Sequence, residues 1–346
     1  MENEKKTVKE RIYELLVDAG ELSVGQIMTR GDYGGRTYVS RVLAQLRDEG
    51  RVLVRKEGRN VWYSVAKDWV ALDEDVILTE VGEDEVWRKI RQSAGFVEHV
   101  PEKAEGILQF AFTEMLNNAI DHSKSGVGHV KLWREGEEVK FIVRDKGVGV
   151  FRNVMAKRGL ADETAAIQEL VKGKVTTAPK WHSGEGIFWT SKIADRFELA
   201  SYGWRLLVDN ELGDYAIEKL DAGLLGTEVR FVIGADTEKS LHELFGRFAL
   251  NRENYSFDTT LIPVKLFETG EVWISRSQAK RVLEGLDKYK RIVFDFKGIE
   301  LVGQAFADEI FRVFRRNHPE VVLEPINMNE AVRMMVERAM NDETWG

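Results

Sequence analysis

The amino-acid sequence predicts an α+β protein of several domains, and three observations support this class. The chain has 346 residues, more than twice the length of a typical single domain, so we expect two or three folding units. Its central strand-like segments come in pairs joined by short turns, which favours a layered sandwich over a doubly wound parallel sheet. Near the C-terminal end, strand-like and helix-like segments alternate, which predicts a small α/β domain.

The first domain, over residues 1–67, is expected to contain three helices and a hairpin. Apolar residues recur at helical spacing in three segments, namely residues 7–19, 24–28 and 37–49. Ser23 is suited to cap the second of these helices. Residues 51–55 and 61–65 then alternate apolar and polar side chains around a glycine-containing turn, which predicts a β-hairpin.

This order of three helices and a two-stranded hairpin resembles the winged helix-turn-helix family. In that family the third helix enters the major groove of DNA, and the hairpin, or wing, touches the backbone. The resemblance implies that DNA is contacted from the third helix and the wing by Arg36, Thr37, Tyr38, Ser40, Arg41, Gln45, Arg55, Lys56 and Arg59. The alternative is a winged helix that binds protein or dimerises and has an ordinary solvated basic face.

The distribution of charge favours DNA binding over that alternative. The whole chain has a formal net charge of −8, which argues against nucleic acid if the charge is spread evenly. Residues 30–61, however, contain eight basic and four acidic side chains, so this window carries a local charge of +4.

The middle of the chain is expected to hold a connector and then a second domain. Residues 68–100 are acidic and less periodic, apart from one helical segment at residues 83–93, so we interpret them as a connector. Residues 101–240 are expected to form an α/β sandwich that starts with a long amphipathic helix over residues 101–123. The segments that follow predict a mixed sheet with helices on one face.

Two motifs in the second domain have side chains suited to catalysis or to ligand binding. Glu114 and Asn118 lie four residues apart and so share one face of the long helix. A carboxylate there can deprotonate water, and an amide oxygen is a suitable ligand for magnesium. Asp145 follows a strand-like segment and can accept a hydrogen bond from an amino group, while Gly147 and Gly149 permit a tight turn close to a ligand.

Two further motifs follow in the same domain. Residues 183–187 start a helix, and the free N–H groups of such a helix start can bind phosphate. Gly226 and Thr227 begin a strand, where a small residue and a hydroxyl group can reach a heterocycle. Taken singly, each of the four motifs is more often an ordinary turn or a solvated helix face.

In this order and spacing, the four motifs resemble the N, G1, G2 and G3 boxes of the GHKL ATPase family. That family includes DNA gyrase, the ninety-kilodalton heat-shock chaperone, histidine kinases and mismatch-repair ATPases. The resemblance covers about residues 101–235 and implies ATP and Mg²⁺ as cofactors, with residues 151–180 as a lid over the nucleotide.

The family implies a role for each matching residue. Glu114 is expected to be the general base for hydrolysis and Asn118 the magnesium ligand, while Asp145 is expected to bind the adenine amino group. The other residues expected at the nucleotide are Asp121, His122, Gly147, Gly149, Ser183, Gly184, Glu185, Gly186, Ile187 and Thr227.

The sequence also departs from the family pattern. The second glycine box reads HSGEGIF rather than a run of alternating glycine and leucine. His99 stands beside a proline and outside the two-helix hairpin of sensor kinases, so we do not expect a histidine kinase. No lysine after residue 235 can be assigned as the phosphate-sensing lysine of some relatives. We therefore expect ATP binding and leave hydrolysis open.

The last domain, over residues 255–346, resembles a STAS-like domain through the strand-turn-helix segment at residues 291–314. Anti-sigma-factor antagonists carry a phosphorylatable serine in the turn before that helix. Here residues 301–305 read LVGQA, so the hydroxyl group is missing. The pairing of an ATPase with this domain resembles a fusion of anti-sigma kinase and antagonist modules and implies partner switching. Alternatively, the domain only packs on the ATPase or mediates self-association.

Composition excludes several function classes. The chain has no cysteine, which excludes disulfide scaffolds, thiol nucleophiles and cysteine-ligated metal centres. No segment approaches the roughly 20 apolar residues that a bilayer span needs, so we expect no membrane partner. The charged start does not resemble a signal peptide, and we expect a cytoplasmic location.

Three functional hypotheses follow. The first is an ATP-binding regulator, Mg²⁺-dependent and slowly hydrolysing, that couples nucleotide state to the binding of DNA or of a protein partner. We expect it to work as a homodimer, as winged-helix regulators and many GHKL proteins do. The second is an enzyme proper, either an ATPase or a serine/threonine kinase of the anti-sigma type. The third is a nucleotide-binding scaffold without catalysis.

Overall fold

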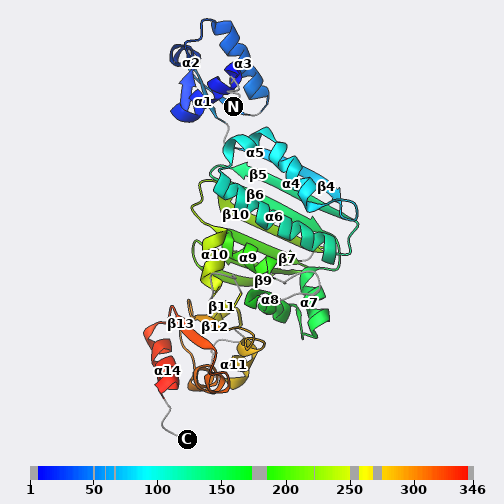
Figure 1. Ribbon diagram of the computed structural model, residues 1–346, viewed down its shortest axis with the longest axis vertical. Helices are drawn as coiled ribbons and strands as arrows, with labels where there is room; N and C mark the ends of the chain where they lie inside the picture. The colour runs from blue at the N-terminus through cyan, green and yellow to red at the C-terminus, as the bar shows by residue number, and fades with distance from the viewer. Residues whose placement is uncertain are drawn as a thin grey trace.

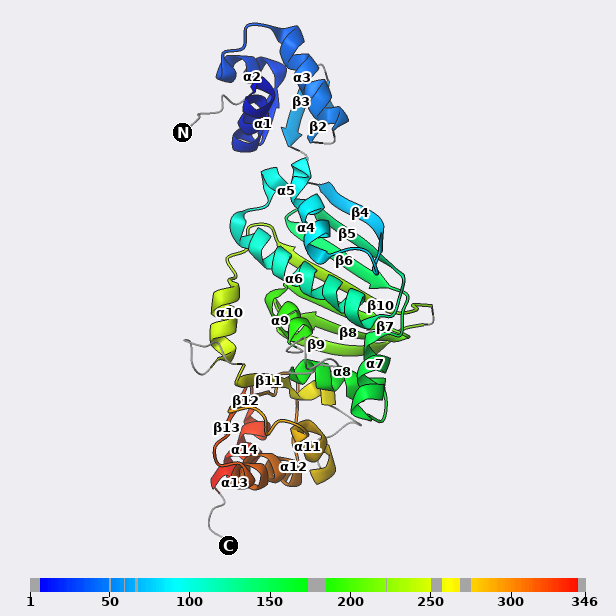
Figure 2. The same cartoon turned by 45° about the vertical axis from the view of Figure 1, so that its right-hand side comes forward.

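The computed structural model shows three domains arranged in a row along the chain (Figure 1). It describes residues 7–49, 51–58, 60–65, 68–173, 185–221, 223–249, 257–267 and 275–341. The N-terminal domain lies at one end, the large sheet with its helices lies in the middle, and the C-terminal domain lies at the other end (Figures 1 and 2). No helix in these ranges combines the length and the apolar character that a membrane span requires.

The N-terminal domain consists of three helices and a three-stranded antiparallel sheet. Its elements are α1 (Val8–Ala19), β1 (Glu21–Ser23), α2 (Val24–Gly31), α3 (Arg36–Asp48), β2 (Val52–Glu57) and β3 (Asn60–Val65). The side chains of Thr7 and Ser23 form capping boxes that start α1 and α2. The sheet has the order β1-β3-β2, and the domain has a hydrophobic core of its own. The predicted helices and hairpin are confirmed, and β1 adds a strand to them.

The central domain is built on a seven-stranded sheet. The strands are β4 (Trp69–Ile77), β5 (Val127–Glu135), β6 (Glu138–Asp145), β7 (Arg196–Ser201), β8 (Trp204–Asp209), β9 (Asp214–Lys219) and β10 (Thr227–Gly234). Their order is β4-β5-β6-β10-β7-β8-β9, and every neighbouring pair is antiparallel. The expectation of a mixed sheet is wrong, because β10 lies between β6 and β7 and runs antiparallel to both.

Helices cover one face of this sheet, as the sequence predicts (Figure 1). The helices of the domain are α4 (Glu83–Gln92), α5 (Ala94–His99), α6 (Glu102–His122), α7 (Val150–Arg158), α8 (Glu163–Lys172), α9 (Gly186–Ile193) and α10 (Leu241–Phe248). The long helix α6 packs on the centre of the sheet, where the ring of Phe112 meets that of Phe141 at 5.5 Å between centroids. The core therefore lies between α6 and strands β5, β6 and β10.

Residues 68–100 belong to the central domain and do not form a connector. They supply the edge strand β4, which pairs along its length with β5, and the helices α4 and α5. Trp87 of α4 is buried in the same core as α6. The acidic residues that suggested a connector are spread over these elements. In β4, Asp73 pairs with Lys131 at 2.8 Å and Glu74 pairs with Lys89 of α4 at 3.0 Å. Three more acidic residues form the first turn of α4, namely Glu83, Asp84 and Glu85. The ion pairs of the edge strand and the acidic first turn of α4 thus contribute most of the acidic composition.

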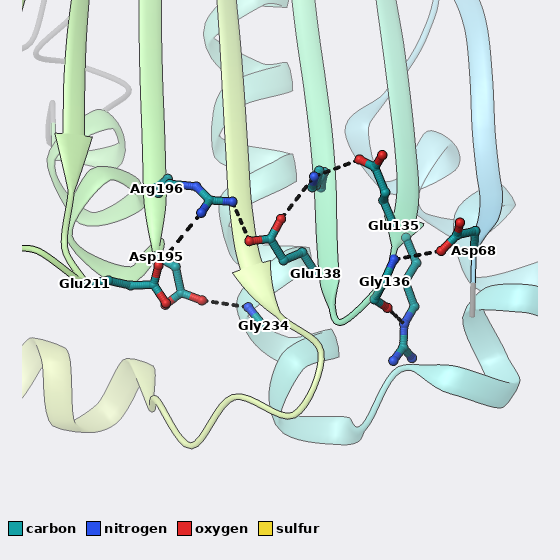
Figure 3. A network of polar contacts seen from close by, with 10 residues as sticks. Asp68, Glu135, Gly136, Glu138, Asp195, Arg196, Glu211 and Gly234 are labelled. Carbon is teal, nitrogen blue, oxygen red and sulfur yellow. Dashed lines mark hydrogen bonds and ion pairs between the residues drawn. The ribbon is translucent and has the colours of Figure 1, made fainter. Parts of the chain in front are cut away.

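A polar network closes the end of the sheet where β5 turns into β6 (Figure 3). Glu138 pairs with Lys140 at 3.0 Å and also with Arg196 of β7, on the far side of the intervening strand β10. At the β5–β6 turn, the backbone N–H of Gly136 donates to Oδ1 of Asp68 at 2.7 Å. These contacts fix the end of β6 that lies opposite Asp145, so this strand is held at both ends.

The C-terminal domain contains three parallel strands in the order β11-β12-β13. Its elements are β11 (Thr259–Pro263), η1 (Val264–Phe267), α11 (Arg276–Leu283), β12 (Arg291–Asp295), α12 (Gln304–Asp308), η2 (Glu309–Phe314), α13 (Arg315–Asn317), β13 (Val322–Ile326) and α14 (Glu330–Asn341). The predicted helix at residues 304–315 contains a π-helical turn, η2. The buried side chains of this domain form one hydrophobic core together with those of the central domain.

Candidate functional site

The candidate site lies at the end of the sheet where β6 stops and β10 starts. Asp145 is the last residue of β6 and is only 4% exposed. Its Oδ1 atom accepts the backbone N–H of Gly147 at 2.7 Å, and the backbone and hydroxyl groups of Thr227 also hydrogen-bond it. Thr227 in turn accepts the N–H of Val150 at 3.0 Å through its Oγ1 atom. The structure therefore brings together Asp145, Gly147 and Thr227, which the sequence placed in separate motifs.

The carboxyl group of Asp145 is held in a dry environment. Burial raises the pKa of Asp145, and the hydrogen bonds from Gly147 and Thr227 only partly offset this effect. A buried carboxylate of this kind is poorly solvated and suited to accept a hydrogen bond from a ligand that excludes water.

Gly149 allows a close contact between the loop after β6 and the turn between β7 and β8. It has φ +80°, and a Cβ atom on it would lie 2.4 Å from the ring of Tyr202. A residue with a side chain would therefore clash here and would also be strained. The close partner of this glycine in the structure is Tyr202, and the expected approach of its backbone to a ligand stays a prediction.

Tyr202 is a residue of the site that sequence reasoning missed. Its hydroxyl donates to the carbonyl oxygen of Gly147 at 2.6 Å, and the guanidinium group of Arg152 lies 3.8 Å from its ring centroid. Tyr202 has φ +43°, a left-handed conformation that a bulky residue rarely adopts. An aromatic residue directly before Gly203 in a tight turn, where asparagine is the usual choice, is the signal that could have identified it.

Glu114 lies against the start of α9. A Cβ atom on Gly186, the first residue of this helix, would lie 2.1 Å from Oε2 of Glu114. Only a glycine leaves room for the carboxylate at this point, next to the free N–H groups of the first turn of α9. The structure thus places Glu114 of the first motif beside Gly186 of the third.

The remaining residues of α6 lie on the same stretch of helix. Asn118 is half-buried one turn after Glu114, His122 is half-buried, and Asp121 is exposed. The helix then ends at Ser123, whose carbonyl oxygen accepts the N–H of Val148 at 2.8 Å. One helix therefore links the carboxylate of Glu114 to the loop that follows Asp145.

Other predicted residues of the third motif are only partly described. Ser183 and Gly184 lie outside the described residues, as does the part of the expected lid from residue 174 to 180. Glu185 precedes α9, and its Oε2 accepts the indole N–H of Trp189 at 3.2 Å. Ile187 is half-buried and packs against the core.

The Asp145–Thr227 pair and the Glu114–Gly186 contact define the two ends of an elongated site. Glu114 and Ser123 are separated by about 13 Å along α6 at the usual rise per residue. The buried carboxylate of Asp145 and the hydroxyl of half-buried Thr227 lie at one end of this stretch. The carboxylate of Glu114 lies at the other end, beside the N–H groups of a helix start. This arrangement suits a long ligand with an amino-bearing ring at one end and an anionic group at the other.

His99 is held between two domains and does not stand free at the surface. Its Nε2 atom contacts the hydroxyl of Tyr13 in α1, and its Nδ1 atom lies 2.9 Å from the carbonyl oxygen of Gly95. Both ring nitrogens therefore have partners within the chain.

The predicted DNA-contacting residues lie mostly on the outer face of α3. Arg36, Thr37, Tyr38, Arg41 and Gln45 are exposed, and Ser40 is half-exposed. On the hairpin, Lys56 is exposed, while Arg59 lies outside the described residues. Arg55 forms ion pairs with Glu21 at 2.8 Å and with Glu57 at 3.0 Å, so the expected wing arginine is already paired within the domain.

Two further observations bear on metal and phosphoryl chemistry. In the part of the chain that the structure describes, no group of three or more histidine or acidic side chains could hold a metal ion. In the C-terminal domain, α12 starts at Gln304 with Gly303 at the N-cap and without a side-chain cap. The turn before this helix therefore offers no serine or threonine hydroxyl group at the cap position.

Comparison with known protein families agrees with this geometry. Residues 83–206 match the family described as histidine kinase-like ATPase domain, and residues 278–333 match a STAS-like domain of unknown function (DUF4325). The first match contains Glu114, Asn118 and Asp145, while Thr227 lies beyond its end. Neither match includes the N-terminal domain. No curated protein and no solved structure matches the chain.

Proposed function

We propose that this protein, which contains a histidine kinase-like ATPase domain and a STAS-like domain, binds ATP with Mg²⁺ and uses the nucleotide to control a DNA or protein partner. One observation carries the proposal. The pair formed by buried Asp145 and half-buried Thr227, and the contact of Glu114 with Gly186, lie toward opposite ends of one stretch of α6, within or just beyond the matched ATPase segment.

Asp145 and Thr227 form the adenine end of the proposed site. The carboxylate of Asp145 accepts a hydrogen bond from the adenine amino group, and the hydroxyl of Thr227 supports it from the neighbouring strand. Because Asp145 is almost fully buried, its hydrogen bond to a ligand is not weakened by competing water.

Asn118 is the residue that would hold Mg²⁺ in the proposed site. Mg²⁺ commonly uses one or two protein oxygens together with phosphate oxygens and waters, so it needs no cluster of acidic residues. The lack of such a cluster among the described residues fits this mode, as does the half-buried amide of Asn118 one turn from Glu114. When bound, Mg²⁺ supplies neutralisation of phosphate charge.

Glu114 is the proposed general base. Its carboxylate lies beside the start of α9, where the family resemblance places the phosphates, and it can accept a proton from an attacking water. The same position also serves transfer to a serine or threonine of another protein, which is the kinase alternative. The STAS-like domain is compatible with such partner switching, although its own turn at residues 301–305 lacks a hydroxyl group.

The test of the proposed function separates binding from hydrolysis. Calorimetric titration of the full chain with Mg-ATP is expected to show binding, and the absence of binding would refute the proposal. Glu114→Ala is expected to retain binding and to reduce phosphate release about 100-fold or more, as loss of a general base does. Glu102→Ala, on the exposed start of the same helix, is the matched control and is expected to leave both unchanged. A parent protein that binds ATP without releasing phosphate would favour the scaffold or the kinase.

The N-terminal domain supports a second proposal, that the protein binds DNA through α3. Arg36 and Arg41 are exposed on this helix, and neither has an ion-pair partner among the described residues. Tyr38 is also 48% exposed, which is unusual for an aromatic residue of a small domain. Unpaired basic side chains beside an exposed aromatic ring suit contact with phosphates and bases.

A further inference from the structure

The last turn of α8 is built into the C-terminal domain. Lys172 is the last residue of α8 and is only 2% exposed. Its Nζ atom donates to Oε1 of Glu169 at 2.7 Å, and to the carbonyl oxygens of Glu284 at 2.8 Å and Arg281 at 3.3 Å. These carbonyl groups lie at the C-terminal end of α11, where a positive charge is favourable. A charged side chain of one domain thus caps a helix of the next.

The backbone of Lys172 is held by the C-terminal domain as well. Thr260 of β11 donates its hydroxyl to the carbonyl oxygen of Lys172 at 2.7 Å, and Tyr289 donates its hydroxyl to the same atom at 2.6 Å. Both lone pairs of this oxygen are therefore used. Burial raises the pKa of Tyr289, so its hydroxyl stays protonated and remains a donor. We call Lys172, Thr260 and Tyr289 the α8 junction.

The C-terminal domain also contacts α9, the helix that starts beside Glu114. Phe257, which precedes β11, lies with its ring centroid 4.6 Å from that of Phe188 and 4.7 Å from that of Trp189, both in α9. The ring of Tyr289 is 5.6 Å from Phe257. In Figure 2, α8 and α9 lie on the side of the central domain that faces the C-terminal domain. Two helices expected at the nucleotide therefore share one interface.

A buried lysine is not needed merely to join two domains. An apolar side chain of similar size would bury the same surface without the cost of removing a cation from water. Lys172 instead specifies one position of α8, because its Nζ atom and its carbonyl oxygen both need their partners from the C-terminal domain. These contacts therefore hold α8 in one position relative to the C-terminal domain, in addition to filling the interface.

We propose, resting on the proposed nucleotide site, that the C-terminal domain positions α8 through the α8 junction and thereby sets the affinity for ATP. Lys172, Thr260 and Tyr289 are positioning residues in this view. Coupling between two sites is reciprocal, so nucleotide binding must change the C-terminal domain by the same free energy. The arrangement of the STAS-like domain then reports the nucleotide state to a partner.

The experiment compares two sets of full-length variants. Thr260→Val combined with Tyr289→Phe removes both hydroxyl donors to Lys172 and leaves no charge unpaired. Thr259→Val is the matched control. Thr259 is the neighbouring residue of β11, is 2% exposed, and its Oγ1 atom has no hydrogen-bond partner in the ranges that the structure describes. Both sets therefore change buried threonine to valine, but only one loosens α8.

Two measurements are made on each protein. Calorimetry with Mg-ATP is expected to show at least about fivefold weaker binding for the double variant, the low end of typical coupling between sites. Thr259→Val is expected to bind as the parent does. Hydrogen exchange is expected to show that Mg-ATP slows exchange in α11 and β12 of the parent and of Thr259→Val, but not of the double variant. If the double variant does not fold, each single variant is measured in its place.

The outcomes distinguish this inference from the proposed function. Unchanged ATP affinity together with unchanged protection of α11 in a folded double variant overturns the inference and leaves the nucleotide site intact. An equal loss of affinity in Thr259→Val also overturns it, because the effect would then follow from core packing. A parent that binds no ATP removes the proposed function, and the inference with it.

Discussion

The hydroxyl group of Tyr202, in the turn between β7 and β8, donates a hydrogen bond to the carbonyl oxygen of Gly147 at 2.6 Å. This bond ties the loop that follows Asp145 to a hairpin on the other side of β10. The backbone conformation of Tyr202 is left-handed, with φ +43°, and such a conformation costs conformational free energy in a residue with a bulky side chain. A strained residue at a candidate site suggests that its side chain has a functional task.

We predict that Tyr202→Phe weakens ATP binding without unfolding the protein. The variant keeps the ring over Gly149 and the stacking of Arg152 but loses the bond to Gly147. One hydrogen bond contributes roughly 1 kcal/mol, so the dissociation constant should rise about fivefold. Tyr215→Phe, a second tyrosine on the central sheet whose hydroxyl accepts a bond from Lys192, serves as the control for calorimetry. Equal affinities for Tyr202→Phe and the parent would contradict the prediction.

Asp145→Asn is predicted to separate stability from binding. Because burial raises the pKa of Asp145, the folded protein binds more protons than the unfolded chain at pH values between the ordinary and the raised pKa. The free energy of unfolding therefore falls as the pH rises through this window, and the carboxylate lowers stability at every higher pH. Removing its charge should raise the melting temperature of the nucleotide-free protein at neutral pH.

The same change should weaken ATP binding about tenfold or more, because a hydrogen bond to a charged group is lost. Thermal melts and calorimetry on one preparation test both effects, with the exposed Asp75→Asn as the control. A variant that is less stable and binds ATP normally would show that Asp145 only supports the fold.

The contact between the N-terminal and central domains is predicted to depend on pH. Burial lowers the pKa of His99, so its neutral ring accepts the hydroxyl of Tyr13 through Nε2, with Nδ1 donating to Gly95. Between the lowered pKa and the ordinary value of about 6.5, the folded protein binds fewer protons than the unfolded chain, so stability falls as the pH drops through this window. A protonated ring would also face Arg51, which stacks on Tyr13 at 4.4 Å.

Hydrogen exchange in α1 and α5 at pH 5.5 and 7.5 measures this effect. Because intrinsic amide exchange itself slows as the pH falls, the measured rates are compared as protection factors, and those of the parent are expected to be lower at pH 5.5. Tyr13→Phe cannot donate to His99 and should show a smaller difference between the two pH values. The same pH dependence in the variant and in the parent would mean that another group controls the contact.

The local elements could be predicted from the sequence, because their signals are local. Ser23 caps α2, and glycines end the first helix and start the loop after β6, so these boundaries follow from single residues. The order of the central sheet could not be predicted in this way. β10 inserts between β6 and β7 through contacts that are far apart in sequence, and the outward acidic residues of β4 concealed an edge strand.

The candidate site could also be predicted only in part from the sequence. Glu114, Asn118 and Asp145 could be identified because the spacing of motifs is visible in the chain. The contact of Glu114 with Gly186 and the bond from Tyr202 depend on how α6, α9 and the β7–β8 turn pack, which no motif records. Lys172 was not identified either, since a lysine at the end of a helix is normally exposed.

The last prediction concerns DNA. Arg41→Glu reverses a charge on the exposed face of α3, where Arg36 also lies. If α3 contacts phosphates, binding of the full chain to duplex DNA should weaken about tenfold or more at low salt, and the slope of log affinity against log salt should become shallower by about one unit or more. Arg316→Glu, at another exposed arginine, in α13, changes the net charge by the same amount and should leave the binding unchanged.

Fluorescence anisotropy over a series of salt concentrations measures both quantities for the parent and the two variants. Equal losses for Arg41→Glu and Arg316→Glu would show that only the total charge matters, and no binding by the parent would remove the DNA role.

Repeating the titration with Mg-ATP then tests the regulatory part of the proposal. Because coupling is reciprocal, a nucleotide that changes DNA affinity must have its own affinity changed by DNA to the same extent. A change in DNA affinity in the parent that is absent in Asp145→Asn would connect the two sites through the nucleotide.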